Sequence, residues 1–507
     1  MLSIEDMATF CKKKGFVYPS AEIYGGLAGF WDFGHLGVEL KNNIKSEWWK
    51  YHVQERDDIV GIDGSIITHP KVWQASGHVE NFEDIMLTCS KCKEKIRADH
   101  YIDEKLNINV DGYNSKEIEE IIKKTKLKCP KCSSYFEDIK DFNLMFQTNV
   151  GPKEDKSSVA YLRPETAQLI FVDFKLVADN ARLKLPFGIA QIGKSFRNEI
   201  SPRDFIFRCR EFDMMEIEYF VHPDKNECPY IKGVLNQELN FFSREMQEKK
   251  KKPLLMKVKD ALRINMISEW HAYWLATEQK WFTNLGAKPD NFRVRQHLKK
   301  EKSHYALDTW DLEYNFPFGW KELEGISNRT DFDVQQHMQA SGKDMSIYDE
   351  ETKEKIIPHV IAEPSLGTER AFLVFMFDSY VYDKKRDNVV LKLHPKLASY
   401  KAAIFPLVSN KPQVVKKAKE VYNDLKKYFN VFYDSGGSIG RRYARQDEIG
   451  TPLCVTIDFD SIKKNDVTIR DRDSTQQIRV KIKDLGPKIW EYMCGTKFEK
   501  LGKAILK

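Results

Sequence analysis

The chain has 507 residues, 42% of them hydrophobic and 31% charged, and it carries a formal net charge of +6. This composition excludes a disordered or fibrous protein and predicts a globular one with two or three domains. No stretch has the apolar length of a membrane span and the N-terminus lacks a signal-peptide pattern, so we expect a cytoplasmic protein. The positive charge is compatible with a nucleic-acid partner but does not require one.

Changes in sequence pattern divide the chain into successive segments. We expect a helix at Ile4–Lys14, then a glycine-rich turn and an amphipathic helix near 37–56. A polar insert follows, then a strand-rich region, a helical region, a second strand-rich region ending in a buried helix at 370–382, and a C-terminal α/β domain. The predicted boundaries are 1–87, 88–140, 141–224, 225–290, 291–396 and 397–507.

The polar insert is bracketed by two cysteine pairs, Cys89-x-x-Cys92 and Cys129-x-x-Cys132. Two such pairs have the spacing of a closed, four-thiolate zinc site, and the odd total of nine cysteines favours metal binding over disulfides. We therefore predict a structural zinc site. Two alternatives stay open: plain reduced thiols, or a zinc ribbon that binds nucleic acid. Arg97 and His100 lie close by in the sequence and would serve the ribbon or reach an active site.

The stretch from Ser195 to Tyr219 predicts two strands joined by a turn at 201–204. Because alternate residues of a strand share a face, Arg197 and Glu199 share one face of the first strand. The residues expected on the corresponding face of the second strand are Arg208, Arg210, Phe212, Met214, Glu216 and Glu218, with Met215, Ile217, Tyr219 and Val221 behind them. Such a face suits a ligand that is anionic, flat and cationic in different parts, although a solvated face with ordinary salt bridges is the alternative.

The helix expected at 370–382 is apolar nearly all round, so it should be buried. Arg370 stands in its first turn, where a cation is unfavourable unless an anion lies close by. A bound phosphate explains this arginine, because helix N-termini and guanidinium groups both bind phosphate. The alternative is an ion pair with a neighbouring acid such as Glu369.

Together these segments resemble the class II aminoacyl-tRNA synthetases. The hairpin resembles the second signature motif of that class, the start of the buried helix resembles the third, and the helix–strand passage reaching Pro70 resembles the first. Within the class, the whole chain is most similar to the homodimeric glycyl-tRNA synthetases. The segments that carry this closer resemblance are Leu162–Gln168, Phe196–Glu199, Arg210–Phe212, Met215–Glu216, Glu322–Ile326, Asn328–Asp333 and Glu363–Ser365.

The resemblance implies an α+β fold in which helices flank an antiparallel sheet, with a zinc-binding insertion and a C-terminal α/β anticodon-binding domain. It implies a glycine–tRNA ligase that uses ATP and Mg²⁺, with structural Zn²⁺, and that forms a homodimer acting on tRNA(Gly). Two positions depart from the bacterial pattern: Leu366-Gly-Thr-Glu stands where Ala-Gly-x-Asp is usual, and Met214 stands where glutamine is common.

The resemblance also implies roles for single residues. Arg197 would hold the α-phosphate of ATP, Arg208 and Arg370 the outer phosphates, and Phe212 would stack on adenine. Glu322 is the expected Mg²⁺ ligand, since hard cations prefer carboxylate oxygen. The residues expected to act in catalysis are Arg197, Glu199 and Arg370. The set expected at ATP is Arg197, Asn198, Glu199, Phe207, Arg208, Cys209, Arg210, Glu211, Phe212, Glu322, Leu323, Gly367, Thr368, Glu369 and Arg370.

Selection of the smallest amino acid requires a tight pocket with carboxylates for the ammonium group. The resemblance assigns the ammonium to Glu165, Glu216 and Glu363, with Ser365 closing the pocket. Arg329, with Arg97 as a second candidate, would engage the substrate carboxylate. The set expected at glycine is Arg97, Glu165, Phe212, Asp213, Met214, Met215, Glu216, Arg329, Glu363, Pro364, Ser365, Leu366 and Gly367.

Two other functions stay open at this stage. One is a different class II synthetase, such as the prolyl or threonyl enzyme, which has the same type of C-terminal domain. The other is a catalytically inactive synthetase-like subunit that binds nucleic acid or regulates a partner. Such subunits usually lack the phosphate-binding arginines, whereas Arg197, Arg208 and Arg370 are all present.

Overall fold

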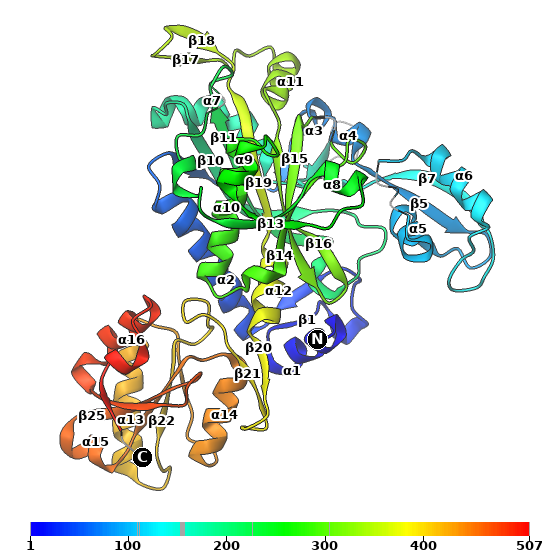
Figure 1. Cartoon of the computed structure of the whole chain (residues 1–507). Helices are drawn as coiled ribbons and strands as arrows, with labels where there is room; N and C mark the ends of the chain where they lie inside the picture. Colours follow the sequence, from blue (N-terminus) through cyan, green and yellow to red (C-terminus); the bar gives the residue numbers. More distant parts are fainter. Residues whose placement is uncertain are drawn as a thin grey trace.

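The computed structural model describes residues 2–108, 110, 112–152, 158–225, 227–303 and 305–505. Three parts are visible in Figure 1: a central body built on a large sheet, a small domain that projects from it between residues 83 and 143, and a C-terminal domain. No helix within these ranges is long and apolar enough to cross a membrane.

The central body is built on a nine-stranded sheet. Neighbouring strands are antiparallel except for two parallel pairs, β12–β14 and β10–β3, so the predicted antiparallel α+β class is confirmed. In spatial order the strands are β13 (Leu254–Lys257), β12 (Glu238–Phe242), β14 (Phe292–Gln296), β15 (Asp308–Phe316), β16 (Gly319–Asn328), β19 (His359–Gly367), β11 (Glu211–Val221), β10 (Phe187–Phe196) and β3 (Ile59–Ile62).

The predicted hairpin is present as β10 and β11, paired in register from Phe187 opposite Phe220 to Phe196 opposite Glu211. The predicted alternation is confirmed for β11, because Met215, Ile217 and Tyr219 all face the main apolar core. The second strand begins later than predicted, however. Residues Phe205–Phe207 form a 3₁₀ turn, so Arg208 and Arg210 precede the strand instead of belonging to it.

Helices cover both faces of the sheet. On one face α2 (His35–Trp49), α10 (Glu269–Asn284) and α12 (Thr368–Ser379) bury the main core. The predicted burial of α12 is confirmed, but the helix ends at Ser379, and residues 380–382 belong to strand β20 instead. On the opposite face α7 (Ala167–Ala181) and α11 (Phe332–Ser341) cover only the end near β10. The remainder of that second face carries polar residues and is free to hold a site.

The segment 225–290, predicted to be helical, also contributes two strands, so that prediction is wrong for β12 and β13. Both strands extend the central sheet beyond β14. The run Lys249–Lys252 and Pro253 between the two strands have the sequence of a loop. Pairing of β12 with β14 stabilises the extended conformation, which local preference alone does not predict. The helical part is confirmed in α10, whose Trp270, Trp274 and Trp281 are buried.

Shorter elements complete the central body, and α1 spans the predicted range. These elements are α1 (Ile4–Lys14), β1 (Val17–Pro19), β2 (Trp31–Phe33), a π-helical turn (Lys50–Gln54), β4 (Ile67–Thr68), α3 (Pro70–Ala75), α4 (His78–Asn81), β8 (Phe146–Asn149), β9 (Val159–Leu162), α8 (Arg244–Glu248), α9 (Val258–Arg263), β17 (Ile347–Asp349), β18 (Glu354–Ile356), β20 (Tyr380–Asp383) and β21 (Asn388–Leu391).

The projecting domain has its own three-stranded sheet and its own apolar core. Its strands are β5 (Glu83–Cys89), β6 (Lys95–Arg97) and β7 (Phe136–Asn143), covered by α5 (Ala98–Leu106) and α6 (Ser115–Thr125). Pairing of β5 with β7 starts at Glu83 opposite Asn143. The sheet thus extends past both ends of the predicted segment 88–140, and we refer to residues 83–143 as the insert.

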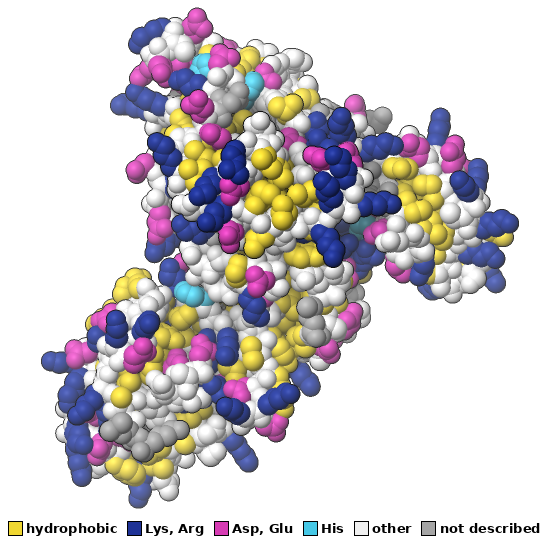
Figure 2. Space-filling model, viewed as in Figure 1, with side chains coloured by type: hydrophobic (Ala, Val, Ile, Leu, Met, Phe, Trp, Pro, Cys, Tyr) yellow, Lys and Arg dark blue, Asp and Glu magenta, His cyan; other side chains and the backbone are white. Residues whose placement is uncertain are grey.

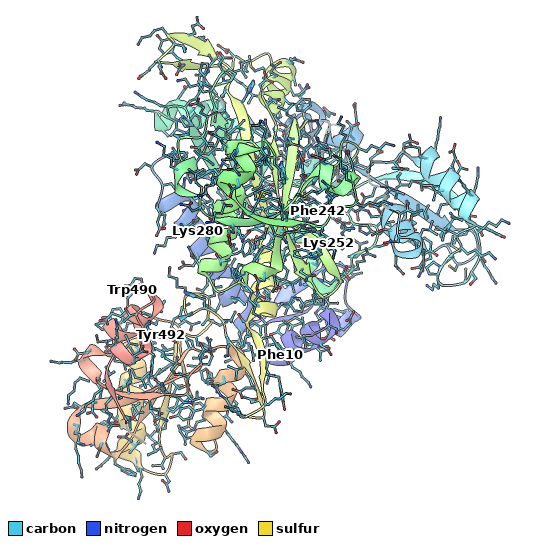
Figure 3. The ribbon with its side chains drawn as sticks, in the orientation of Figure 1. Phe10, Phe242, Lys252, Lys280, Trp490 and Tyr492 are labelled. Carbon is cyan, nitrogen blue, oxygen red and sulfur yellow. The ribbon has the colours of Figure 1, made fainter. Side chains whose placement is uncertain are left out.

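The C-terminal domain is an α/β unit with a separate core, as predicted. Its sheet has the order β23 (Val431–Tyr433), β22 (Ala402–Pro406), β24 (Leu453–Ile457), β25 (Asp466–Asp471), β26 (Gln477–Lys481) and β27 (Lys503–Ala504). The helices are α13 (Pro412–Leu425), α14 (Ile439–Ile449), α15 (Phe459–Lys464) and α16 (Leu485–Met493). Trp490 and Tyr492 mark α16, at the edge of this domain nearest the central body in the view of Figure 3.

Candidate active site

Two connected cavities lie on the polar face of the central sheet. The first, of about 300 Å³, lies between β11, the start of α12 and the insert. The second, of about 430 Å³, lies over β11, β15, β16 and β19. Their walls share Phe82, Arg197, Glu322 and Ser365. One ligand can therefore occupy both cavities, with its middle beside Arg197.

Arg197 follows directly after β10 and is held by aromatic rings instead of acids. Its Cζ lies 5.4 Å from the ring centroid of Phe82 and 5.4 Å from that of Phe212, and its Nε donates to the carbonyl of Pro164 at 3.1 Å. Stacking on rings orients a guanidinium without neutralising it. This arrangement suits an anion placed between the two cavities.

Arg370 lies in the first turn of α12, at the positive end of the helix dipole. Its Nη1 donates to Oε1 of Glu322 at 3.1 Å and to the Glu322 carbonyl at 2.9 Å, and its Cζ lies 4.7 Å from the ring of Phe207. The alternative considered above, an ion pair with an acid, is present, but with Glu322 instead of Glu369, which points inward and lies 2.5 Å from Lys41. The position of Arg370 at the helix N-terminus also suits a bound phosphate.

The insert supplies one wall of the first cavity. Nη1 of Arg208 lies 3.1 Å from the ring nitrogens of His100, and Arg97 pairs with Asp84 at 2.6 Å while lying 3.8 Å from Glu199. Burial, followed by the charge of Arg208, lowers the pKa of His100 to about 2, so this imidazole is neutral. Burial raises the pKa of Asp84 to about 6. Arg97 faces this cavity, whereas His100 lines a neighbouring hollow.

Glu216 is fixed at the floor of the second cavity. One carboxylate oxygen accepts hydrogen bonds from the backbone N–H of Thr166 at 2.7 Å and from the Thr166 hydroxyl. The other oxygen accepts a hydrogen bond from Oγ of Ser365 at 2.6 Å, and Ser365 is the residue opposite Glu216 in the β11–β19 pairing. With both oxygens engaged, the carboxylate has one orientation.

Glu165 and Glu363 complete an acidic wall. Glu165 lies 3.2 Å from Nε2 of His78, and Nη1 of Arg329 donates to Glu363 at 2.6 Å. Burial, reinforced by Glu165 and Glu216 and opposed by Arg329, raises the pKa of Glu363 to about 8. Burial also acts to raise the pKa of Glu165, but His78 and then Arg329 outweigh it and hold the value below its usual range. Because the acids of this wall outnumber the cations paired with them, the wall suits an ammonium ligand.

A third hollow of about 430 Å³ lies between the insert and strands β14–β16 and meets both cavities at Glu322. Its walls carry both charges: Arg295 pairs with Glu301 at 2.7 Å, and Nε2 of His297 lies 2.8 Å from Asp311. Burial acts to lower the pKa of His297, but Asp311 outweighs it and raises the pKa to about 9. The hollow gives a polar ligand a route to the junction of the two cavities.

Most residues predicted for a ligand lie in the walls of the two cavities. Those predicted for ATP are Arg197, Glu199, Phe207, Arg208, Cys209, Phe212, Glu322, Gly367, Glu369 and Arg370. Those predicted for glycine are Arg97, Glu165, Phe212, Met214, Glu216, Glu363, Ser365 and Gly367.

The other predicted residues lie outside these walls. They are Asn198, Arg210, Glu211, Asp213, Met215, Leu323, Arg329, Pro364, Leu366 and Thr368. Met215, Leu323 and Leu366 face the main core. Arg210 donates to the carbonyl of Glu199 at 2.8 Å instead of facing a ligand, because β11 has not yet begun at this residue.

Arg329 differs most from its expected role. It is 1% exposed, and its guanidinium binds Asp333 at 2.7 Å as well as Glu363. The predicted contact with a substrate carboxylate therefore has no support in its position. Arg329 instead holds Glu363 from behind.

Phe82, His78 and Thr166 were missed by reasoning from the sequence. Thr166 lies within the segment 162–168 that carries the family resemblance, so a signal was present there. His78 and Phe82 lie at and after the short helix α4, which carries no motif. Only the fold brings them to Glu165 and Arg197.

The four cysteines of the insert form the one cluster of metal-ligating side chains found in the described ranges, with ligand atoms within 4.8 Å of one another. The sulfur atoms of Cys89 and Cys132 are 3.4 Å apart and those of Cys92 and Cys129 are 3.6 Å apart. A tetrahedral zinc with Zn–S bonds of about 2.3 Å needs sulfur separations near these values. The residues present fit a closed zinc site.

Comparison with known proteins gives the same family throughout. Residues 146–380 match the tRNA synthetase class II core domain (G, H, P, S and T), and residues 401–492 match an anticodon binding domain. The chain is 47% identical to the glycine–tRNA ligase of Caldanaerobacter subterraneus subsp. tengcongensis, over 95% of this chain and 96% of the relative. It is 46% identical to that of Geobacillus kaustophilus over 96% and 97%, and 45% identical to that of Clostridium tetani over 95% and 97%.

Proposed function

Because the chain belongs to the glycine–tRNA ligases of the class II aminoacyl-tRNA synthetases, we propose that it activates glycine with ATP and transfers the glycyl group to the 3′ end of tRNA(Gly). The observation that carries this proposal is the junction at Arg197. On one side of this residue lies a cavity with Arg208 and Arg370, and on the other lies a cavity with Glu165, Glu216 and Glu363. The reaction requires this arrangement, because the carboxylate of the amino acid must lie next to the α-phosphate of the bound ATP.

In the first step the glycine carboxylate attacks the α-phosphorus and pyrophosphate leaves. The residues that would align this step are Arg197 at the α-phosphate and Arg208 and Arg370 at the outer phosphates. Phosphoryl and nucleotidyl transfer depend mainly on alignment and charge neutralisation, so no protein base is required. Mg²⁺ bound with the triphosphate would neutralise part of its charge, and Glu322 is the carboxylate that would hold it.

Glycine would bind through its ammonium group at Glu165, Glu216 and Glu363. Since Glu216 is fixed by Thr166 and Ser365, the ammonium and hence the α-carbon would have one position. A larger amino acid would then place its side chain against the wall that contains Ser365. Packing of this kind discriminates by about 1–3 kcal/mol per methyl or methylene group.

Transfer to tRNA would use the third hollow and the C-terminal domain. The hollow has a volume of about 430 Å³ and reaches the junction of the cavities at Glu322. The C-terminal domain matches anticodon binding domains and carries 22 Lys and Arg against 13 Asp and Glu over residues 401–507. Dark blue basic side chains surround it in Figure 2. Such a surplus suits a phosphate backbone.

Zinc at the four cysteines would be structural. Lys93 and Ser133, each four residues after the first cysteine of a pair, both have positive φ, and their N–H groups donate to the carbonyls of Cys89 and Cys129. These matched turns aim both thiolates of each pair at one point. A closed four-thiolate site leaves no position for a substrate, so the metal would hold the end of the insert's sheet that lies away from Glu83 and Asn143.

We further propose that the enzyme is a homodimer and acts in the cytoplasm, where tRNA is used for translation. Near the region of the first motif several apolar side chains are exposed: Ile67 by 50%, Val172 by 40% and Leu176 by 62%. Burial of such a surface against a second copy would favour association. Sedimentation of purified protein tests this, and a monomer at micromolar concentration would contradict it.

The activity is tested by ATP–pyrophosphate exchange with each of the twenty amino acids in turn. Exchange should depend on glycine, and transfer of labelled glycine to tRNA should follow. Exchange driven by proline or threonine instead would favour another class II synthetase. A lack of exchange with every amino acid would favour the inactive, nucleic-acid-binding alternative.

A further inference from the structure

The hairpin β20–β21 connects the active site to the C-terminal domain. It follows α12 directly, and Arg370 lies in the first turn of α12. At its base, the ring of Tyr380 packs edge-on against Phe10 of α1, with centroids 5.2 Å apart. Phe10 is labelled in Figure 3. From there the hairpin extends along α14 of the C-terminal domain (Figure 1). The hairpin is thus anchored in the central body and reaches the second domain.

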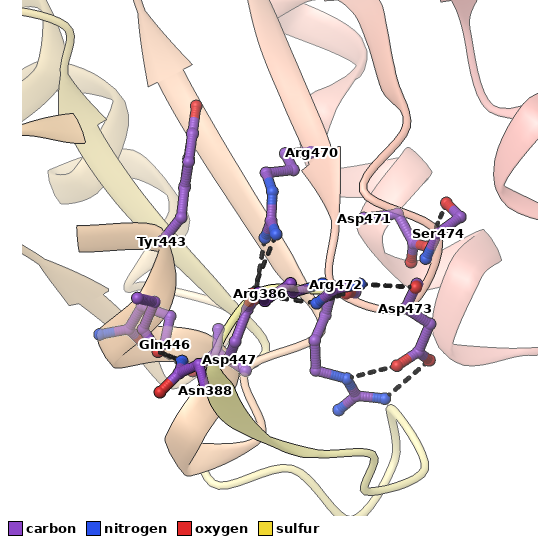
Figure 4. A network of polar contacts seen from close by, with 12 residues as sticks. Arg386, Asn388, Tyr443, Gln446, Asp447, Arg470, Asp471, Arg472, Asp473 and Ser474 are labelled. Atoms are coloured by element: carbon purple, nitrogen blue, oxygen red, sulfur yellow. Dashed lines mark hydrogen bonds and ion pairs between the residues drawn. The ribbon is translucent and has the colours of Figure 1, made fainter. Parts of the chain in front are cut away.

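Arg386, in the turn of this hairpin, inserts its guanidinium into the C-terminal domain (Figure 4). Nη1 donates to Oδ2 of Asp447 at 3.1 Å and to the carbonyl of Arg472 at 2.7 Å, and Nη2 donates to the carbonyl of Asp473 at 2.8 Å. Nε lies 3.1 Å from Asp383 at the start of the same turn. One side chain therefore makes three hydrogen bonds across the domain boundary.

The acceptors for Arg386 are held rigidly by their own domain. Asp447 is 2% exposed and also accepts two hydrogen bonds from Arg470, at 2.8 and 2.9 Å. Nη1 of Arg472 donates to the carbonyl of Gly450 at 2.8 Å. Gly450 has a φ of +86° and packs closely against Leu393, which lies just after the end of β21. A Cβ atom on Gly450 would lie 2.9 Å from the Leu393 side chain. A swing of the domain would therefore break several contacts at once.

Further contacts cross the same boundary. The side-chain amide of Asn388 donates to the carbonyl of Ala444 at 3.1 Å, and Lys14 pairs with Glu448. In the linker, Oγ of Ser399 donates to the carbonyl of Leu36 at 2.8 Å. The C-terminal domain is thus tied to the central body on two sides, and Arg386 alone makes three of the hydrogen bonds across the boundary.

We propose that Arg386 is a positioning residue for tRNA charging: it fixes the C-terminal domain at the angle at which one tRNA contacts that domain and the active site together. This inference rests on the proposed function. Simultaneous contact makes the second binding event intramolecular, and this gain is lost when the geometry does not match. Because the hairpin continues α12, the angle is set relative to the helix that carries Arg370.

The test compares two reactions of full-length Arg386→Ala protein. Glycine-dependent pyrophosphate exchange needs no tRNA, so it should stay within about twofold of wild type. Charging should fall at least about tenfold in kcat/KM for tRNA, chiefly through a higher KM, since loss of a second contact weakens binding. Arg386→Lys keeps the charge but not the forked donor, so it should not restore charging fully. The matched control is Lys385→Ala, which removes a positive charge from the same exposed turn.

The outcomes separate clearly. Wild-type charging by Arg386→Ala would overturn the inference, and so would an equal fall in exchange and charging, which indicates a general structural effect. If Arg386→Ala is poorly folded by circular dichroism, Asn388→Ala removes a neighbouring bond across the boundary and should show the same selective loss in smaller degree. Wild-type protein that performs neither reaction would refute the proposed function itself, independently of Arg386.

Discussion

Arg197 is placed by aromatic stacking, and this makes its role testable at the level of a single residue. Its guanidinium lies between Phe82 and Phe212, so its removal leaves no buried acid unpaired. We expect Arg197→Ala to lower glycine-dependent exchange at least about 100-fold, as for loss of one transition-state charge contact, with an unchanged melting temperature. Arg203→Ala, in the exposed turn of the same motif, serves as the control and should retain activity. Near-normal exchange by Arg197→Ala would contradict the assignment.

The acidic wall predicts a proton release on glycine binding. Burial raises the pKa of Glu363 to about 8, so this acid of the free site is largely protonated at neutral pH. A bound ammonium favours the ionised carboxylates and expels a proton, which means that affinity for glycine should rise with pH between 6 and 8. Calorimetry at pH 7 in two buffers of different ionisation enthalpy measures this release, which we expect to reach about one proton per glycine. Glu363→Gln should reduce it, and proton uptake would contradict the prediction.

Among the elements, strand β16 contains a β-bulge that places a predicted site residue. Leu312 pairs with Glu324 and the next residue, Glu313, pairs with Glu322, so Leu323 is an extra residue in β16. The bulge turns Glu322 toward the cavities while Glu324 faces the core, where it is fully buried and neither oxygen has a hydrogen-bond partner. Bulges beside active sites commonly redirect side chains in this way.

Glu324→Leu should therefore stabilise the protein. Burial, reinforced by Glu278, raises the pKa of Glu324 well above its usual value, so the folded state keeps this acid protonated. A raised folded pKa gives stability that is complete below the unfolded pKa and is lost as pH rises above it. The substitution should add about 1–3 kcal/mol in acid, with a larger gain at pH 8. Thermal melts at pH 5 and pH 8 measure this, with exposed Glu238→Leu as control; a gain that is smaller at pH 8 would contradict it.

The insert depends on its four cysteines, because its small apolar core alone gives limited stability. Cys89→Ser should lower zinc content to the level of background and make the insert sensitive to limited proteolysis, while the central body stays folded. Zinc analysis by mass spectrometry and peptide mapping measure both effects. Cys494→Ser, at an exposed cysteine outside the cluster, is the matched control. Purified wild-type protein without bound metal would contradict the zinc assignment.

The sequence could predict those features of these elements that depend on residues close together in the chain. The faces of β11 were predictable because side chains alternate along any strand. The cysteine cluster was predictable from spacing alone. The strands β12 and β13 were not, because a lysine run and Pro253 separate them and their pairing partner β14 lies beyond α10. The bulge in β16 was equally hidden, since it arises from pairing with β15.

At the scale of the whole molecule, the site joins segments that are far apart in the chain. Glu165, Glu216 and Glu363 come from three separate segments, and only the family resemblance indicated that they would meet. His78 joins them from a helix without a motif. Each motif singly indicates a plausible chemistry, but the convergence of the three glutamates is a property of the folded sheet.

The distribution of charge over the whole molecule leads to a prediction about salt. Basic residues exceed acidic ones by nine over residues 401–507, while the whole chain has a net charge of only +6, so the remainder is slightly acidic. Binding to a phosphate backbone releases counterions and weakens steeply with salt. Raising KCl from 50 to 200 mM should therefore increase KM for tRNA more than about tenfold. Glycine-dependent exchange should change far less, because its ligands lie in a partly enclosed site.

Removal of basic side chains on α13, such as Lys416→Gln with Lys419→Gln, should reduce the slope of log KM against log salt. An equal salt dependence of exchange and charging would place the tRNA-binding charge at the active site instead of on the C-terminal domain.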